Sequence, residues 1–239
     1  MSRIAIVGAG VAGLSAAAAL SEDGHEVLVF EGEDQIGYHA SGRSAAMFEE
    51  NYGNATVRAL NRATGPGLRR MGVLTTRGIL MVAQAGEQER FQQDQTDMGM
   101  EPISVEAARS RVPILSDKVA YAAFHNAAMD LDTDAVLQSF LLQARQNGAR
   151  IETAARVDAV RPGIGLNVAG AEVAAEIVVN AAGAWADEIA CLSGVTPIGL
   201  QPYRRSMARF PAPGGHDVRS WPMLFGAGES WYAKPDAGS

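Results

Sequence analysis

The chain has 239 residues, of which 47% are hydrophobic and 20% are charged, and its formal net charge is −7 at pH 7. This profile is typical of a globular protein that buries a substantial core, and it argues against intrinsic disorder. The acidic balance argues against a nucleic acid or an anionic membrane surface as a partner, because both require a basic face. No apolar run reaches membrane-spanning length, so we predict no membrane span and a cytoplasmic location. The single cysteine, Cys191, lies in an apolar helical pattern and is predicted to pack in the core.

The start of the chain follows the order strand, glycine turn, helix, strand and acid. An apolar strand at residues 3–7 runs into the turn GAGVAG at 8–13, which leads into an alanine-rich helix over 14–20. A second apolar strand at 26–30 then ends at Glu31. A glycine turn alone is weak support for nucleotide binding, but here each flanking element falls where a dinucleotide-binding fold needs it.

The glycines and the acid have separate physical roles in such a fold. Gly8 permits the tight turn, Gly10 lets the backbone approach a pyrophosphate, and Gly13 lets the helix pack closely on the strand. The phosphates are expected at the helix N-terminus, where unpaired N–H groups and the helix dipole favour negative charge. Glu31 is expected to bind the ribose hydroxyls and to repel a 2′-phosphate, which disfavours NADP; a solvated acid at a strand end is the alternative.

The rest of the chain is predicted to alternate loops, helices and short strands. In chain order, the patterns first predict a polar loop at 37–47 that leads into a helix, then a strand at 78–83 and a helix at 86–98. A short helix from Ser104 to Pro113 and a strand at 119–125 follow, and then an amphipathic helix that is capped by 130–134 and ends at Gly148. The last predicted elements are strands at 150–153, 156–160, 165–168, 171–173 and 177–180. The amphipathic helix is expected to bury Ala135, Leu137, Phe140, Leu141, Leu142 and Ala144.

Two features near the end of the chain carry further expectations. The strand at 177–180 is of the apolar kind that is buried on both faces of a parallel sheet. It leads into small residues at 181–185, at the carboxyl end where open α/β sheets bind ligands, although a tight turn without a ligand is the alternative. From Leu200 onward, strands rich in aromatic and arginine residues, such as Tyr203 and Phe210, predict a second, antiparallel layer.

Several motifs together resemble a known family. They are GAGVAG with Glu31, YHASGRSAAM at 38–47, the segment at 129–151, and VVNAAGAWAD at 178–187. This combination resembles the FAD-dependent D-amino acid oxidase (DAO) superfamily. The tail, with GLQPYRRSMARF, SWPMLF and ESWYAKPDAG, makes the chain most similar to the D-arginine dehydrogenase type of flavin amino-acid dehydrogenase. The resemblance covers essentially the whole chain.

The predicted fold class is α/β, with two interleaved domains. A Rossmann-like FAD-binding domain is expected over 1–51 and 119–199, and an α+β substrate domain with a mixed or antiparallel sheet over 52–118 and 200–239. The resemblance implies FAD rather than NAD as the cofactor. The residues alone leave these two open, because both cofactors contain the ADP half.

The resemblance also implies a set of cofactor-binding residues. The ADP half is assigned to Gly8, Ala9, Gly10, Val11, Ala12, Gly13 and Glu31, with Val157 meeting the adenine through its backbone. The phosphate and flavin path is assigned to Ser41, Gly42, Arg43, Ser44, Ala45 and Ala46. The remaining two residues, which are expected to pass close to the cofactor, are Ala182 and Gly183.

The implied reaction transfers hydride from the α-carbon of a D-amino acid to the flavin. The amine is neutral, and the resulting imine is hydrolysed by water to a 2-oxo acid. FAD performs the redox step, while the protein orients the substrate. The implied partners are therefore a small amino-acid substrate and an unidentified electron acceptor.

Three residues match the family's catalytic positions. Arg205 matches the arginine that binds the substrate carboxylate, and such a charge-assisted bidentate pair contributes about 1.5–3 kcal/mol. Its alternative is exposure to solvent, since it neighbours Arg204 in an alternating strand. Tyr52 and Tyr232 match tyrosines whose hydroxyls reach the substrate, although each fits an amphipathic residue at a core edge. The remaining candidates, His39 and His125, are predicted to be satisfied structural histidines, and no metal-ligand spacing is present.

Two departures from the D-arginine type affect the expected substrate. That type has an acid where this chain has Ile79 and a histidine where it has Met47. A buried guanidinium facing Ile79 would lack its counter-charge, a penalty of several kcal/mol, and every 1.4 kcal/mol changes affinity about tenfold. An apolar substrate pocket at Met47 and Ile79 is therefore expected, with D-leucine, D-methionine or D-phenylalanine preferred over D-arginine.

The chain is also shorter than the family pattern. It ends at Ser239, inside the expected substrate sheet, so it is predicted to be the front portion of an enzyme. Two alternatives stay open. One is a related flavoprotein that oxidises a 2-hydroxy acid or a secondary amine. The other is a non-catalytic FAD-binding fragment.

Overall fold

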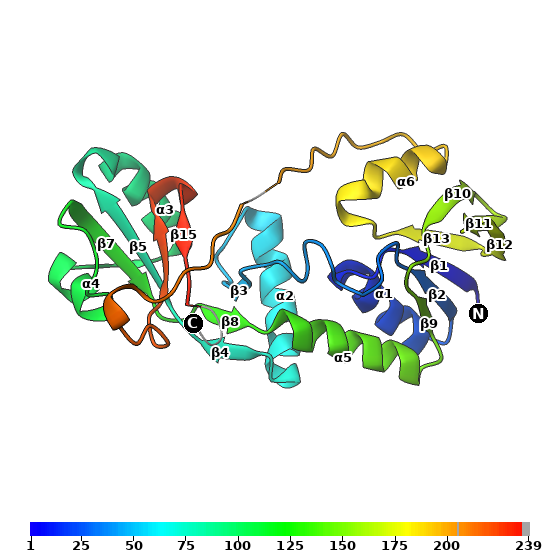
Figure 1. Cartoon of the computed structure of the whole chain (residues 1–239), viewed down its shortest axis with the longest axis horizontal. Helices are drawn as coiled ribbons and strands as arrows, with labels where there is room; N and C mark the ends of the chain where they lie inside the picture. Colours follow the sequence, from blue (N-terminus) through cyan, green and yellow to red (C-terminus); the bar gives the residue numbers. More distant parts are fainter. Residues whose placement is uncertain (205, 236–239) are drawn as a thin grey trace. The chain divides into compact units, whose positions relative to one another are not determined.

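Figure 1 shows the computed structural model, which describes residues 1–204 and 206–235. The chain forms an α/β fold with several sheets, and this confirms the predicted fold class. It divides into two units: unit 1 comprises Met1–Ser44 and Thr133–Arg205, and unit 2 comprises Ala45–Asp132 and Ser206–Ser239. The units are interleaved in the sequence.

Unit 1 is built on a parallel sheet with the order β13-β1-β2-β9. The strands are β1 (Arg3–Val7), β2 (Glu26–Phe30), β9 (Arg150–Glu152) and β13 (Ile177–Asn180). The register places Val7 opposite both Phe30 of β2 and Asn180 of β13. The carboxyl ends of these three strands therefore meet at one edge of the sheet.

Both faces of the central strands are covered, which explains why β1 and β2 are continuously apolar. Ile4, Ile6, Val27 and Val29 pack against helices α1 (Val11–Glu22) and α5 (Thr133–Gln146). The opposite face is covered by α6 (Ala186–Leu192) and by an antiparallel sheet of β10 (Val157–Arg161), β11 (Gly165–Val168) and β12 (Ala171–Ala174). A turn of 3₁₀ helix, η2 (Gly183–Trp185), joins β13 to α6.

Three burial predictions in unit 1 were wrong. Ile177 is 47% exposed, because β13 is an edge strand that the covering layers do not enclose. Leu142 is 59% exposed, since α5 instead buries Val136, Leu137, Leu141 and Ala144, and Leu142 is turned away from that stripe. Cys191 is exposed because α6 buries Ile189 instead.

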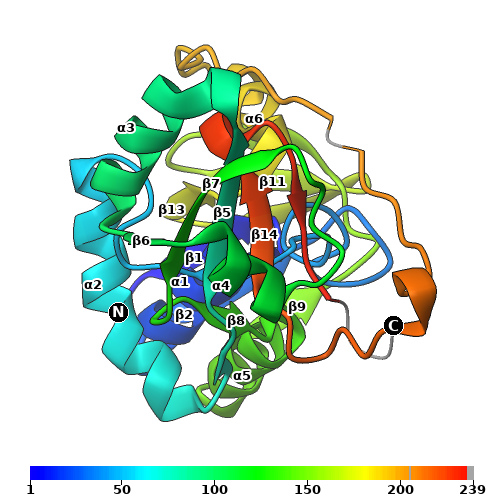
Figure 2. The same ribbon diagram turned by 90° about the vertical axis from the view of Figure 1, so that its left-hand side faces the viewer.

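Unit 2 contains a five-stranded mixed sheet with the order β15-β14-β5-β7-β6. The strands are β5 (Ile79–Gln84), β6 (Glu101–Ile103), β7 (Val119–His125), β14 (Met223–Gly226) and β15 (Tyr232–Ala233). Strand β14 is parallel to β5, and the other pairs are antiparallel. In Figure 2, β7, β5 and β14 run side by side with α4 (Val105–Arg111) in front of them.

The two faces of this sheet are covered by different elements. Helix α3 (Gln88–Met98) contributes Phe91 to one face, where it packs with Met81 and Phe225. The other face of the sheet is covered by helix α4 and by the segment that contains Val218 and Trp221. Three short 3₁₀ turns, η1 (Ala85–Glu87), η3 (Pro213–Gly215) and η4 (Ala227–Glu229), connect these elements.

A second, smaller sheet in unit 2 has the order β3-β8-β4 and is antiparallel. It consists of β3 (Met47–Phe48), β4 (Leu74–Thr76) and β8 (Met129–Leu131). Helix α2 (Ala55–Met71) precedes β4 and ends before Gly72, its C-cap residue. Asn54 caps the start of this helix, because its side chain accepts a hydrogen bond from the Val57 N–H. The predicted loop at 37–47 is therefore followed first by a strand, and only later by the helix.

The boundaries between the units differ from the predicted domain boundaries. Residues 119–132 lie in unit 2, because β7 pairs with β5 and β6 while β8 pairs with β3 and β4. Residues 45–51 also lie in unit 2, because they contain β3.

The predicted antiparallel layer after Leu200 is limited to the pair of strands β14 and β15. The described residues between 200 and 222 form no strand, and Tyr203 and Phe210 are 84% and 66% exposed. None of the helices in the described ranges is both long enough and apolar enough to cross a membrane.

Candidate functional site

The glycine turn of unit 1 lies at the carboxyl ends of β1 and β13, and its shape requires glycine at two positions. Gly8 has φ +103°, and a Cβ there would lie 2.5 Å from the carbonyl oxygen of Ala181. A Cβ on Gly13 would overlap the carbonyl oxygen of Gly8. Helix α1 can therefore approach the turn this closely only because Gly8 and Gly13 have no side chain, as expected from the sequence.

The start of α1 presents backbone donors without a competing acid. Gly10 is the N-cap residue and makes no side-chain cap, and the first turn contains no acidic residue. The Val11 N–H donates to the Ser41 hydroxyl at 3.0 Å. A hydroxyl both accepts and donates, so Ser41 can in turn donate a hydrogen bond to a phosphate oxygen at this positive helix end. The arrangement fits a pyrophosphate.

Glu31 is held next to the same turn. Its Oε2 accepts a hydrogen bond from the Ala9 N–H at 2.8 Å, and its Oε1 accepts from the Glu33 N–H at 3.0 Å. Each carboxylate oxygen has a second lone pair, so both can still accept from a hydroxyl of a bound ribose. The turn, Ser41 and Glu31 together fit the ADP half of a dinucleotide.

The loop that contains Ser41 is folded onto the turn. The Gly37 N–H donates to the Ala9 carbonyl at 3.0 Å, and the Gly42 N–H donates to the Gly37 carbonyl at 2.7 Å. Arg43 donates from Nε to the Tyr38 carbonyl at 3.0 Å and lies over the Tyr38 ring. These contacts place residues 41–43 beside the start of α1, while the boundary between units falls between Ser44 and Ala45.

His39 supports this loop. Its Nε2 lies 2.8 Å from Glu33 Oε1, and its ring is 4.5 Å from that of Trp185 in η2. The role of Trp185 was missed, because nothing local in the sequence links η2 to a loop so far away along the chain.

Of the other predicted cofactor residues, Ala45 and Ala46 begin unit 2, and the remaining three occupy two places in unit 1. Ala182 adjoins the glycine turn, since its Cα would lie 3.2 Å from a Cβ on Gly8, and Gly183 begins η2 with φ +54°. Val157 begins β10, and its side chain is buried in the layer behind β1 and β2. Contact of these residues with a cofactor stays a prediction.

In unit 2, the strand register places several predicted substrate residues on one sheet face. Ile79 pairs with Met223, Met81 pairs with Phe225, and Phe225 pairs with Tyr232. Side chains of directly paired residues lie on the same face of a sheet. Met47 packs against this cluster from β3, and Ile79 is only 4% exposed. We call the group formed by Met47, Ile79, Met81, Met223, Phe225 and Tyr232 the apolar face; Ile79, Met81 and Phe225 are buried, Met47 and Met223 are half-buried, and Tyr232 is exposed.

The predicted catalytic residues have different surroundings. Tyr232 is 43% exposed at the edge of the apolar face, and Tyr52 is 47% exposed, so neither ring is a core residue. The Tyr52 hydroxyl lies 3.2 Å from Glu229 Oε2 and donates to it. Arg205 lies outside the described residues, and its role stays a prediction of the sequence.

A buried acid and histidine lie beside Ile79. His125 pairs directly with Ile79 across β5 and β7, and its Nε2 is 3.2 Å from Glu49 Oε2. Glu49 Oε2 makes no hydrogen bond within the described residues, while Oε1 accepts a hydrogen bond from the Asn51 N–H at 2.9 Å. Sequence reasoning missed Glu49, because the pairing depends on the distant contact between β3 and β7.

No group of three or more metal-binding side chains occurs in the residues 1–204 and 206–235.

Comparison with known proteins gives one family and several similar structures. The family described as FAD dependent oxidoreductase (DAO) matches residues 3–239. A curated relative named flavin-containing monoamine oxidase AofH, from Mycobacterium tuberculosis, is 53% identical over 45 residues, which are 18% of this chain and 10% of that protein.

Two solved structures match most of the chain. Glycine oxidase from Geobacillus kaustophilus has a TM-score of 0.79 and 21% identity, with 99% of this chain and 69% of that chain covered. L-Proline dehydrogenase from P. horikoshii has a TM-score of 0.73 and 21% identity, with 94% of this chain and 64% of that chain covered. At this identity the likeness shows a shared fold. The chain thus spans about two thirds of these proteins and a tenth of the curated relative.

Proposed function

The chain belongs to the FAD dependent oxidoreductase (DAO) family, and from this premise we propose that it oxidises the CH–NH₂ group of a D-amino acid with an apolar side chain. Its cofactor is FAD. As an oxidoreductase it needs a small-molecule substrate and an electron acceptor. The observation that carries the proposal is the apolar face of unit 2, on which Met47 and Ile79 pack together and Tyr232 lies at the exposed edge.

The cradle in unit 1 supports the cofactor half of the proposal. Gly8 and Gly13 allow the tight turn and the close packing of α1, and the Ser41 hydroxyl, which accepts from the Val11 N–H, offers a donor to a pyrophosphate at the start of this helix. Glu31 can receive the ribose hydroxyls while it remains fixed by two backbone N–H groups. Unit 1 is therefore proposed as the FAD-binding unit, and unit 2 as the substrate unit.

The proposed reaction removes two electrons and a proton from the substrate carbon as hydride. The amino acid, with a neutral amine, becomes a protonated imino acid (an iminium), and water then replaces the nitrogen to give a 2-oxo acid and ammonium. FAD supplies the two-electron acceptor when it is bound. The protein's part is to hold the amino acid and to exclude water from it.

Roles of the substrate-unit residues follow from their chemistry. The apolar face would take the side chain of the substrate, and the Tyr232 and Tyr52 hydroxyls are suited to its polar end. Arg205 remains the proposed carboxylate ligand, on sequence grounds alone. None of the six side chains of the apolar face is an acid that could pair with a basic side chain of the substrate. This disfavours D-arginine and D-lysine.

The names of similar structures support an amino-acid substrate. They include a glycine oxidase, an L-proline dehydrogenase and an L-amino acid deaminase from Proteus vulgaris. The preference for the D configuration is a proposal that rests on the sequence resemblance.

The test uses the full chain loaded with FAD under anaerobic conditions. D-Leucine should bleach the flavin absorption band, whereas L-leucine, which has the same side chain and the opposite configuration, should not. Bleaching by a 2-hydroxy acid or by sarcosine, without bleaching by any D-amino acid, would contradict the proposal and favour a related oxidoreductase. Bound FAD that no substrate bleaches would indicate a binding chain without this activity.

A further inference from the structure

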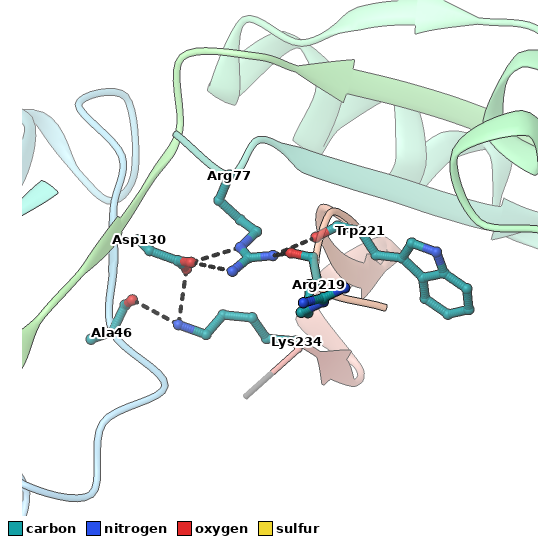
Figure 3. Close-up of polar contacts among 6 residues, drawn as sticks. All are labelled: Ala46, Arg77, Asp130, Arg219, Trp221 and Lys234. Carbon is teal, nitrogen blue, oxygen red and sulfur yellow. Dashed lines mark hydrogen bonds and ion pairs between the residues drawn. The ribbon is translucent and has the colours of Figure 1, made fainter. Parts of the chain in front are cut away.

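Three charged side chains from distant parts of unit 2 meet in one cluster, shown in Figure 3. Arg77 Nε and Nη2 each lie 2.6 Å from Asp130 Oδ2, and Lys234 Nζ lies 3.0 Å from Asp130 Oδ1. We call Arg77, Asp130 and Lys234 the Asp130 cluster. Their side chains are only 16–18% exposed, so water and salt screen these contacts less than they screen surface pairs.

The two cations of the cluster also bind backbone carbonyls. Lys234 Nζ donates to the Ala46 carbonyl at 3.2 Å. Arg77 Nη1 donates to the carbonyls of Arg219 and Trp221 at 2.7 and 2.9 Å. The cluster thus holds together β8, the turn before β5, the end of the loop before β3, the segment before β14, and the segment after β15.

Each contact lies close in sequence to a residue of the apolar face. Ala46 immediately precedes Met47, Lys234 follows Tyr232 by two residues, and Arg77 precedes Ile79 by two residues. Asp130 is itself the pairing partner of Met47 in the β3–β8 ladder. Displacement of any cluster member would therefore move the backbone that carries Met47, Ile79 or Tyr232.

We infer that Lys234 is a positioning residue that sets the distance between β3 and β15, and so the shape of the apolar face that selects the substrate side chain. This inference rests on the proposed function of unit 2 as the substrate unit. Lys234 does not need to touch the substrate. It acts through the Ala46 carbonyl and Asp130.

The main test compares two substrates in the FAD-loaded full chain. The measurement is the ratio of kcat/KM for D-leucine to kcat/KM for D-alanine, because a loss of folded protein lowers both values equally and cancels in the ratio. Lys234→Met keeps the length of the side chain and leaves Asp130 paired with Arg77. It should lower the ratio by about tenfold, because the larger side chain loses its fit to the apolar face.

Two further variants are the controls. Lys234→Arg keeps a cationic donor and should hold the ratio within about threefold of the wild-type value, since a charge-assisted hydrogen bond can be restored. Lys118 is the other lysine of the chain and is exposed at the start of β7. Lys118→Met should leave the ratio unchanged. A Lys234→Met ratio equal to the wild-type ratio, or an equal fall for both substrates, would overturn the positioning role.

A second measurement does not depend on turnover. Amide hydrogen exchange of peptides covering 45–48 and 230–235 should be faster in Lys234→Met than in Lys118→Met, while exchange in α3 stays the same. If the wild-type chain oxidises no D-amino acid, the proposed function fails, and the exchange rates then decide separately whether Lys234 holds these segments. Equal exchange in both variants would overturn the inference.

Discussion

The cofactor cradle of unit 1 and the apolar face of unit 2 are built in different ways. The cradle is made mostly of backbone: the space left by Gly8 and Gly13, the N–H groups of Ala9 and Val11, and the carbonyl of Gly8. The apolar face is made of side chains that β3, β5, β14 and β15 bring together from distant parts of the sequence.

This difference predicts different responses to substitution. A site built from backbone tolerates few substitutions, because an added Cβ collides with backbone atoms that cannot rotate away. A face made of side chains can change its preference while the strands beneath it stay in place. Substitutions in unit 1 should therefore alter FAD affinity, and substitutions on the apolar face should alter substrate preference.

The largest effect is expected from Gly13→Ala. The new Cβ would overlap the Gly8 carbonyl, and overpacking against backbone costs about 3 kcal/mol or more. FAD affinity should fall by at least about a hundredfold, as measured by titration of the flavin fluorescence. Gly32→Ala is the matched control, since nothing lies within 4 Å of a Cβ at Gly32. Normal FAD affinity in Gly13→Ala would show that the turn is not a rigid cradle.

The next effect is expected on the apolar face, from Ile79→Glu. A carboxylate at this position would supply the counter-charge that a guanidinium lacks in the wild type, so the ratio of kcat/KM for D-arginine to that for D-leucine should rise by at least about tenfold. FAD affinity should stay within about twofold. Ile164→Glu, on an exposed turn of unit 1, is the control. A wild-type chain that already prefers D-arginine would contradict the apolar interpretation of this face.

A smaller effect is expected from Glu31→Gln in the cradle. The amide keeps the shape of the side chain, but it loses the charge that strengthens hydrogen bonds from the Ala9 N–H and from a ribose hydroxyl. FAD affinity should fall by about tenfold, since hydrogen bonds to charged groups contribute about 1.5–3 kcal/mol. Glu172→Gln, in an exposed ion pair with Arg161, should have no effect. Equal affinities in the two variants would remove Glu31 from the cofactor site.

The smallest effect is expected at Asp217, in an exposed ion pair with Arg219. Hydrogen bonds from the Arg219 side chain and backbone lower the pKa of Asp217 from 3.8 to about 2. Folding favours the charged carboxylate, so this contribution to stability is present above about pH 4 and is lost as the pH falls toward about 2. Asp217→Asn should leave Tm unchanged at pH 7, because exposed pairs contribute little, and should flatten the dependence of Tm on pH in that window. A large fall in the Tm of Asp217→Asn at neutral pH would contradict this prediction, because it would mean that the exposed Asp217–Arg219 pair contributes strongly to stability.

The parts of the molecule that depend on neighbouring residues could be predicted from the sequence. The glycine turn, Glu31 and the strands β1 and β2 follow from local spacing and from the apolar pattern of strands buried on both faces. Ser104 could likewise be identified as the N-cap of α4, where its hydroxyl accepts from the Ala107 N–H.

The parts that depend on long-range pairing could not be predicted. Strand β7 was recognised as a strand, but its assignment to a unit required its pairing with β5. The contact of Glu49 with His125 and the Asp130 cluster depend on the register of strands that are far apart in the chain. Cys191 and Leu142 show the limit of helical patterns, because apolar residues on the short helix α6, or outside the buried stripe of α5, need not face the core.

The most direct test of the account is a titration of the flavin-free, folded chain with FAD in the presence and absence of ADP. If the turn at 8–13 is the seat of the ADP half, one FAD binds per chain and ADP competes with it, whereas riboflavin, which lacks that half, binds poorly. A folded chain that takes up no FAD in excess, or that binds FAD with an affinity ADP does not change, would contradict the account.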